Sequence, residues 1–216
     1  MNKNRYNNNY VFSITLTGVM LSLALISLFI SNYLIWPFGQ YFGLKFDLSI
    51  IFILPLFISI KKHYGLIALF IRFILGPIIT GNIDISGYLG HFILLISNFI
   101  YIYSFLLFNK LFFSKKVICS IILAILITTV IITLLNILFF TPLFFYIFKM
   151  VNSISFIEIA QNWSQISNEK FNYYWFTLII YGTFNLFSFS IASIFLYYMQ
   201  FFILKKQKKS IEKQEI

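Results

Sequence analysis

Stretches of apolar residues long enough to cross a lipid bilayer recur along this chain and leave little room for anything else. One spanning helix needs about 20 apolar residues. Stretches near or above this length occupy residues 11–30, 64–80, 88–108, 117–140 and 171–204. A further stretch, 48–60, is shorter and ends at two lysines. Only 10% of the residues are charged, against about a quarter in soluble domains. The sequence therefore predicts an all-α integral membrane protein, a bundle of six transmembrane helices.

Basic residues are concentrated in every second connection between these stretches. The basic connections and ends hold Lys3, Arg5, Lys61, Lys62, Lys110, Lys115, Lys116, Lys205, Lys206, Lys208, Lys209 and Lys213. Lysine and arginine near helix ends are retained in the cytoplasm. Six spans with both termini in the cytoplasm reproduce this alternation, and we expect a multi-pass protein of the plasma membrane. The net charge of +10 then has a topological cause. It gives no support to nucleic acid binding, and the cluster at 205–213 is expected to meet anionic lipid headgroups of the bilayer.

The chain divides into one membrane domain and two short ends. Residues 1–10 are rich in asparagine and are predicted to form a disordered cytoplasmic tail. Residues 11–204 form the six-helix membrane domain, and 205–216 a basic cytoplasmic tail. The connection 31–47 mixes turn residues with interfacial aromatics and predicts an ordered outer loop. Residues 141–170 form a second long outer segment.

Catalytic and metal-binding patterns are missing from the sequence. It contains no phosphate-binding P-loop, so the chain cannot bind ATP phosphates in that manner and any energy input must come from elsewhere. The two histidines, His63 and His91, have neither an H-E-x-x-H pattern nor a cysteine pair, and we expect His91 to pack or to contact a ligand. Loops, helix ends and a tail hold the six acids, Asp47, Asp84, Glu158, Glu169, Glu212 and Glu215. We therefore expect no enzyme activity, no metal and no cofactor.

Four polar side chains fall inside the apolar stretches. They are Arg72, Asn98, Asn136 and Asn185. Such groups are costly in hydrocarbon unless they face a cavity or one another, so each is a candidate site residue. The alternatives are hydrogen bonds between helices for the amides and snorkelling to an interface for Arg72.

The first helix carries two small residues, Gly18 and Ser22, at a spacing that places them on one face. Such a face lets another helix approach closely. Packing inside the bundle and docking of a partner protein both explain it.

Six segments, in this order and spacing, resemble the S components of energy-coupling factor (ECF) vitamin transporters. The likeness is closest to the riboflavin-type members and to related permease subunits of mollicutes. The segments are GVMLSLA (18–24), LKFDLSIIFILPLF (44–57), YGLIALFIRFILGP (64–77), GYLGHF (87–92), NILFFTPLFFY (136–146) and FNLFSFSI (184–191). Three positions depart from the family pattern: Tyr88 replaces a glutamate, His91 an asparagine and Ser188 a lysine.

The resemblance implies a vitamin site in the outer half of the bundle, beneath the outer loops. Riboflavin is favoured, with folate, thiamine or another vitamin as alternatives. Trp36 and Tyr41 would cover the flat ring and Asn136 with Asn185 would bond its polar edge. His91, Asn98, Arg72 and Ser188 complete the expected substrate-binding set.

The resemblance also implies partners: a transmembrane coupling subunit that docks on Gly18 and Ser22, and two cytoplasmic ATPases. A different class of function stays open at this point. The chain could be a structural subunit of a membrane complex that uses the same helix face and binds no ligand.

Overall fold

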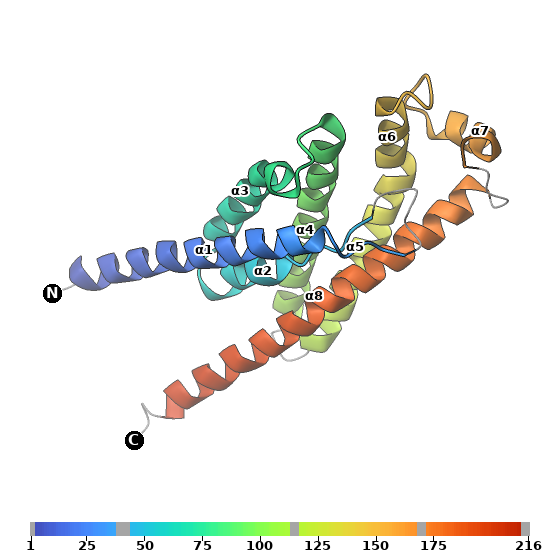
Figure 1. The fold of residues 1–216 in the computed structure, drawn as a ribbon. Coiled ribbons are helices and arrows are strands. Elements are labelled where there is room, and N and C mark those ends of the chain that lie inside the picture. Colours follow the sequence, from blue (N-terminus) through green and yellow to red (C-terminus); the bar gives the residue numbers. More distant parts are fainter. Residues whose placement is uncertain (1–2, 38–43, 113–116, 168–171, 213–216) are drawn as a thin grey trace.

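A computed structural model describes residues 3–37, 44–112, 117–167 and 172–212, and within these ranges the chain is almost entirely helical (Figure 1). Its one extended feature there is a single antiparallel bridge between Ile35 and Lys45. In chain order the elements are α1 (Lys3–Ser31), α2 (Ile50–Ser59), α3 (Lys62–Thr80), α4 (Ile85–Leu111), α5 (Val117–Leu135), the π-helix η1 (Asn136–Phe140), α6 (Thr141–Ile147), α7 (Phe156–Ser167) and α8 (Tyr173–Glu212). The predicted all-α architecture is confirmed.

Five helical segments in the described part of the chain are long and apolar enough to cross a membrane. They are Tyr10–Ser31, Lys62–Thr80, Ile85–Leu111, Val117–Ile147 and Tyr173–Tyr198. In the most apolar part of each, between 22% and 39% of the residues are buried inside the protein. Most of this apolar surface therefore faces outward, which suits lipid and not water.

Helix α2 differs from the other apolar helices in length and position. It has 10 residues, and at 1.5 Å per residue it is about half as long as the hydrocarbon core is thick. Its side chains are mostly buried, and it packs against α1, α3, α4 and α8. Ile53, Leu54 and Leu56 are central in the main hydrophobic core. Helix α2 is thus a core helix surrounded by longer ones.

Contact between α2 and α3 requires a glycine at position 65. A Cβ atom there would lie 2.3 Å from Cδ2 of the buried Phe57 ring. We expect Gly65→Ala to lower the free energy of unfolding by about 1–3 kcal/mol, because the ring must leave its packed position. The matched control is Gly18→Ala, since a Cβ on Gly18 meets nothing within 4 Å. Thermal unfolding in detergent measures both, and equal midpoints would contradict the prediction.

The fifth apolar helix runs further than the sequence predicted. It was expected to end at Phe140, but it continues through η1 and α6 to Ile147. A proline just beyond that expected end, Pro142, lies in the first turn of α6, where a missing N–H is tolerated. The π-helix just before it, which starts at Asn136, absorbs the irregularity.

A tyrosine from α8 supports this irregular turn. In a π-helix the carbonyl of Ile137 would accept a hydrogen bond from residue 142, but a proline there has no N–H. The hydroxyl of Tyr173 donates to the Ile137 carbonyl at 2.6 Å instead. The buried carbonyl is therefore satisfied by a side chain.

Removing that hydroxyl is expected to destabilise the chain. Tyr173→Phe should cost about 1–3 kcal/mol, because it leaves the Ile137 carbonyl buried without a donor. The neighbouring Tyr174→Phe is the control, since Tyr174 is 40% exposed while Tyr173 is fully buried. Thermal unfolding of both variants tests the difference, and the prediction is wrong if Tyr174→Phe loses as much stability.

The segment after α6, predicted as a long outer segment, is folded. Helix α7 lies within it and packs through Ile159 and Trp163. Together with Ile137, Phe145 and Tyr173 these side chains form a second hydrophobic cluster, at the end of the molecule away from the start of α1 and the end of α8 (Figure 1). Helix α1 begins at Lys3 and α8 ends at Glu212, beyond the apolar stretches at both ends. These two ends lie on the same side in Figure 1.

Candidate functional site

A cavity of about 530 Å³ lies between the main core and the second cluster. Its walls come from the connection between α1 and α2 with the adjoining ends of these two helices, and from α3, α4, α5, the η1–α6 turn, α7 and α8. Cavities of about 300–1,000 Å³ are typical of small-molecule sites. The polar residues lining it are Ser31, Asn32, Lys45, Asp47, Thr80, Asn82, Ser86, His91, Ser97, Asn98, Asn136, Thr141, Tyr181, Asn185 and Ser188.

The connection between α1 and α2 closes one side of the cavity. Its two arms pair through backbone hydrogen bonds, from Trp36 N to the Leu44 carbonyl at 2.9 Å and from Phe46 N to the Leu34 carbonyl at 3.0 Å. The predicted ordered loop is thus present in its two arms. The arm from Leu44 to Asp47 contributes four successive residues to the cavity wall.

Trp36 fixes this loop to α8. Its ring centroid lies 5.5 Å from Phe46, 6.1 Å from Phe184 and 5.5 Å from Phe187, and the residue is buried. Phe46 and Phe184 line the cavity, whereas Trp36 does not. Trp36 was expected to cover the ligand, but it lies behind the cavity wall. Its ring fills the space between the loop and α8.

A buried ion pair organises the next part of the wall. Arg72 Nη2 lies 2.8 Å from Asp47 Oδ2, and Arg72 is fully buried. Asn98 donates to the same oxygen at 2.9 Å. The other oxygen, Oδ1, accepts from the Ser49 amide at 2.9 Å and from its hydroxyl at 2.5 Å. Arg72 Nε also donates to Ser49 Oγ at 2.9 Å. All four residues thus form one network that joins the loop to α3 and α4.

The Asp47 carboxylate stays charged in this setting. Burial raises the pKa of Asp47, but Arg72 and the hydrogen bonds from Ser49 and Asn98 outweigh it and hold the pKa below its usual value. The pair is therefore a matched positive and negative charge, and it contributes no net charge to the cavity wall.

A second polar network joins the two arms of the loop to α3 and α4. Lys45 Nζ donates to Asn32 Oδ1 at 3.1 Å, and Asn32 Nδ2 donates to the Thr80 carbonyl at 3.4 Å. Thr80 Oγ1 lies 3.0 Å from the Gly76 carbonyl, to which it donates, and 3.1 Å from His91 Nε2. The hydroxyl proton is committed, so Nε2 must donate to Thr80. One ring proton of His91 therefore lies on Nε2.

Close packing holds the other face of His91. A Cβ at Gly76 would lie 2.6 Å from His91 Nδ1, and this nitrogen is buried with no hydrogen-bond partner in the structure. A second proton, on Nδ1, would be buried and unpaired, so we assign His91 as the neutral tautomer with its single proton on Nε2. Groups of three or more potential metal ligands do not occur among the described residues.

Amide and hydroxyl groups line the side formed by α5, η1 and α8. Asn185 Nδ2 donates to Thr133 Oγ1 at 3.2 Å, and the hydroxyls of Thr141 and Tyr181 lie 2.7 Å apart. Asn136 is the first residue of the π-helix and lines the cavity. Aromatic side chains form much of the remaining wall, and they include Phe144, Phe145, Phe148, Trp163, Phe184 and Phe189.

The structure brings together five of the eight side chains that the sequence suggested for the substrate. These five line the cavity: His91, Asn98, Asn136, Asn185 and Ser188. Arg72 lies behind Asp47 and acts through it, and it does not snorkel. Trp36 lies behind the wall, and Tyr41 lies outside the described residues.

Sequence reasoning missed Lys45 and Asp47, which were assigned only to a loop. A signal for Asp47 existed: a buried arginine needs an acid, and Asp47 stands in the segment LKFDLS that carried part of the family resemblance. The hydroxyls of Thr141 and Tyr181 had no such signal.

The small residues of α1 lie apart from the cavity. Gly18 and Ser22 are both exposed, and the Ser22 hydroxyl donates to the Gly18 carbonyl at 2.9 Å. Ala24, by contrast, is fully buried in the main core. Of the two explanations for the small-residue face, packing inside the chain is therefore wrong for Gly18 and Ser22.

Comparison of the chain with protein-family models, curated proteins and solved structures finds no match.

Proposed function

We propose that this chain is the substrate-binding S component of an energy-coupling factor importer and captures a vitamin at the outer face of the membrane. The observation that carries the proposal is the cavity of about 530 Å³ with Asn98, Asn136 and Asn185 in its wall. Amides within apolar helices are costly unless they bond a partner or a ligand. An aromatic surface opposite polar groups suits a flat heteroaromatic molecule, and riboflavin is the first candidate from the resemblance.

The proposed topology has six spans with both termini in the cytoplasm of a plasma-membrane protein. The alternation of basic connections supports this orientation. The start of α1 and the end of α8 on one side of the molecule agree with an even number of crossings (Figure 1). Helix α2 then crosses only part of the bilayer, surrounded by the longer helices, and the cavity opens toward the outer side.

Transport would require partner proteins. The sequence has no P-loop, so a transmembrane coupling subunit and two cytoplasmic ATPases would supply the energy. The exposed Gly18 and Ser22 on α1 are the proposed contact with the coupling subunit. The chain itself has no proposed enzymatic step.

Binding by the detergent-purified protein tests the proposal. The panel contains riboflavin, folate and thiamine, and mass spectrometry identifies any small molecule that co-purifies. Ser188→Trp should abolish binding, because the side chain would fill the cavity that Ser188 lines. Ser22→Trp is the control, since Ser22 is exposed on α1; it should bind normally but fail to assemble with partners.

A structural subunit without a ligand would behave differently. It would recover the coupling subunit and the ATPases in a pull-down but retain no small molecule. Its assembly would be lost in Ser22→Trp, and Ser188→Trp would have no effect on any activity. That combination would overturn the proposed ligand capture.

A further inference from the structure

One charge in the cavity wall has no salt-bridge partner among the residues that the structure describes. Lys45 and Asp47 are the lining residues that carry a full charge, and Asp47 is neutralised by the fully buried Arg72 at 2.8 Å. The Asp47 oxygens accept four hydrogen bonds: one from Arg72, one from Asn98 and two from Ser49. Neither oxygen is therefore available to a ligand cation or to Lys45.

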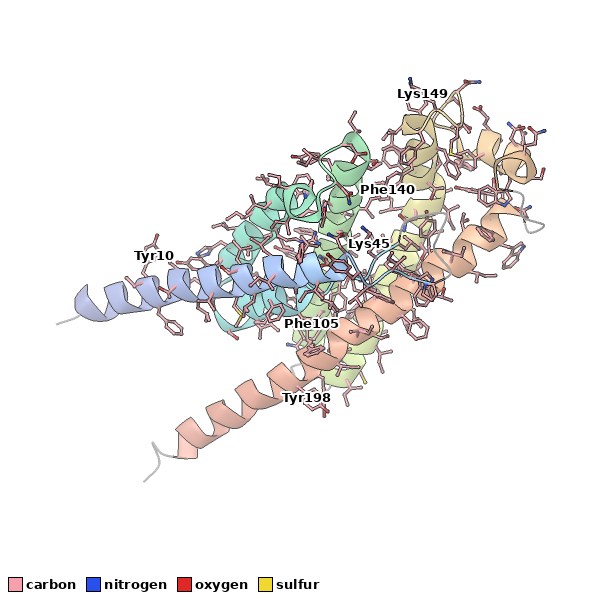
Figure 2. All side chains as sticks on the ribbon, in the orientation of Figure 1. Tyr10, Lys45, Phe105, Phe140, Lys149 and Tyr198 are labelled. Atoms are coloured by element: carbon pink, nitrogen blue, oxygen red, sulfur yellow. The ribbon has the colours of Figure 1, made fainter. Side chains whose placement is uncertain are left out.

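Lys45 is held at the cavity by a neutral group. Its ammonium donates one hydrogen bond, to Asn32 Oδ1 at 3.1 Å, and Asn32 is itself anchored to the Thr80 carbonyl. An ammonium has three donors, so this contact positions the charge and leaves two donors. Among the described residues the one salt bridge is that of Asp47 with Arg72. Figure 2 shows Lys45 among the helices, beside the end of α1, whereas Lys149 lies at the outer tip of α6.

The neighbouring groups do not offset this charge. His91, at the other end of the Lys45–Asn32–Thr80 chain, is neutral in the assigned tautomer. The acid at the start of α4, Asp84, does not line the cavity and forms no salt bridge with Lys45. Its carboxylate accepts instead from the Gly87 amide at 3.0 Å and from the Ser86 hydroxyl. The lining residues thus carry a net positive charge in a half-enclosed, partly apolar space, where a negatively charged ligand group is attracted more strongly than in water.

We propose that the ligand carries a carboxylate or phosphate group that pairs with Lys45, while its flat apolar part lies against Phe144, Trp163 and Phe184. This assignment rests on the proposed ligand capture and narrows its substrate class to anionic vitamins or vitamin phosphates. A charge-assisted pair in such a site favours the anion over its neutral analogue by about 10- to 100-fold.

Matched pairs of compounds test the assignment with the purified wild-type chain. The pairs are riboflavin 5′-phosphate with riboflavin, nicotinate with nicotinamide, and biotin with biotin amide. For at least one pair, the anion should bind about 10- to 100-fold more tightly, as measured by calorimetry or ligand-dependent thermal shift. Lys45→Met should remove the preference, and Lys45→Arg should retain most of it. Lys149→Met, which changes an exposed lysine at the tip of α6, should leave it unchanged.

Each other outcome is decisive. If both members of a pair bind equally well and Ser188→Trp removes both, the ligand capture holds and the anion assignment is wrong. If no compound of any pair binds and none co-purifies, both the assignment and the proposed function fail. Phosphatidylglycerol added to the micelles tests a lipid source of the anion. If it displaces the bound compound in wild type but not in Lys45→Met, the charge serves a lipid headgroup and the assignment to a solute is overturned.

Discussion

Replacing Asp47 by alanine is expected to lower the free energy of unfolding by about 3–5 kcal/mol, the largest effect of the substitutions considered. The reason is that Arg72 would lose its only salt-bridge partner among the described residues. Arg72 is fully buried, and without Asp47 its charge would remain in a low-dielectric core with one hydrogen bond, to Ser49. Asn98 would lose its acceptor as well. Thermal unfolding in detergent, followed by size-exclusion chromatography, measures the loss.

Two comparisons separate this explanation from a general sensitivity to lost acids. Asp84→Ala removes an exposed carboxylate that caps α4, and its effect should be much smaller. Asp47→Ala combined with Arg72→Met should be more stable than Asp47→Ala alone, because the unpaired charge is gone. If Asp47→Ala yields no folded protein, Asp47→Asn provides a milder variant for the same comparison. Equal losses for Asp47→Ala and Asp84→Ala would contradict the prediction.

Arg72 also indicates where sequence reasoning stops. Its position in the middle of an apolar stretch identified it as a residue that needs a partner or a cavity. Its partner acid, Asp47, lies 25 residues earlier in the chain, in the loop arm before α2. Which of the six acids pairs with Arg72 depends on how α3 packs against the loop arm, and no local pattern encodes that. The acid was therefore assigned to a loop, while the arginine was assigned to the ligand.

The helices themselves were predictable because a bilayer imposes length and apolarity on them. The predictions were wrong or incomplete where the local sequence is compatible with more than one structure. The apolar stretch was expected to end at Phe140, but the π-helix and a hydroxyl from Tyr173 let the helix continue past Pro142. Residues 141–170 were expected only as a long outer segment, but Trp163 and Phe145 in it pack into a second cluster. Both outcomes depend on contacts between elements distant in sequence.

The three amides were more informative than the aromatics. An amide inside an apolar helix costs free energy unless it can form hydrogen bonds, which few positions in the bundle allow. Asn98, Asn136 and Asn185 accordingly all line the cavity. An aromatic ring is equally stable against lipid, core or ligand. Trp36 accordingly fills space behind the cavity wall, where the sequence expected it to cover a ligand.

Replacing Asn136 or Asn185 by alanine is expected to weaken ligand binding by about 1–3 kcal/mol, or roughly 5- to 150-fold in dissociation constant. Each variant removes a hydrogen-bonding group from the cavity wall without adding bulk. Titration of the compound that wild type binds most tightly gives the affinities, and thermal unfolding without ligand gives the stability of each variant.

The two amides differ in their protein contacts, and this difference sharpens the test. Asn185 donates to Thr133, so Asn185→Ala also removes a hydrogen bond that holds the cavity wall together. Thr133→Val removes the same bond and keeps the amide; if it weakens binding as much as Asn185→Ala does, Asn185 acts as a positioning residue. Asn162→Ala, on the exposed face of α7, controls for the loss of an amide elsewhere and should bind as wild type does. Unchanged affinity in both Asn136→Ala and Asn185→Ala would separate the amides from the ligand and leave the aromatic wall and Lys45 as its contacts.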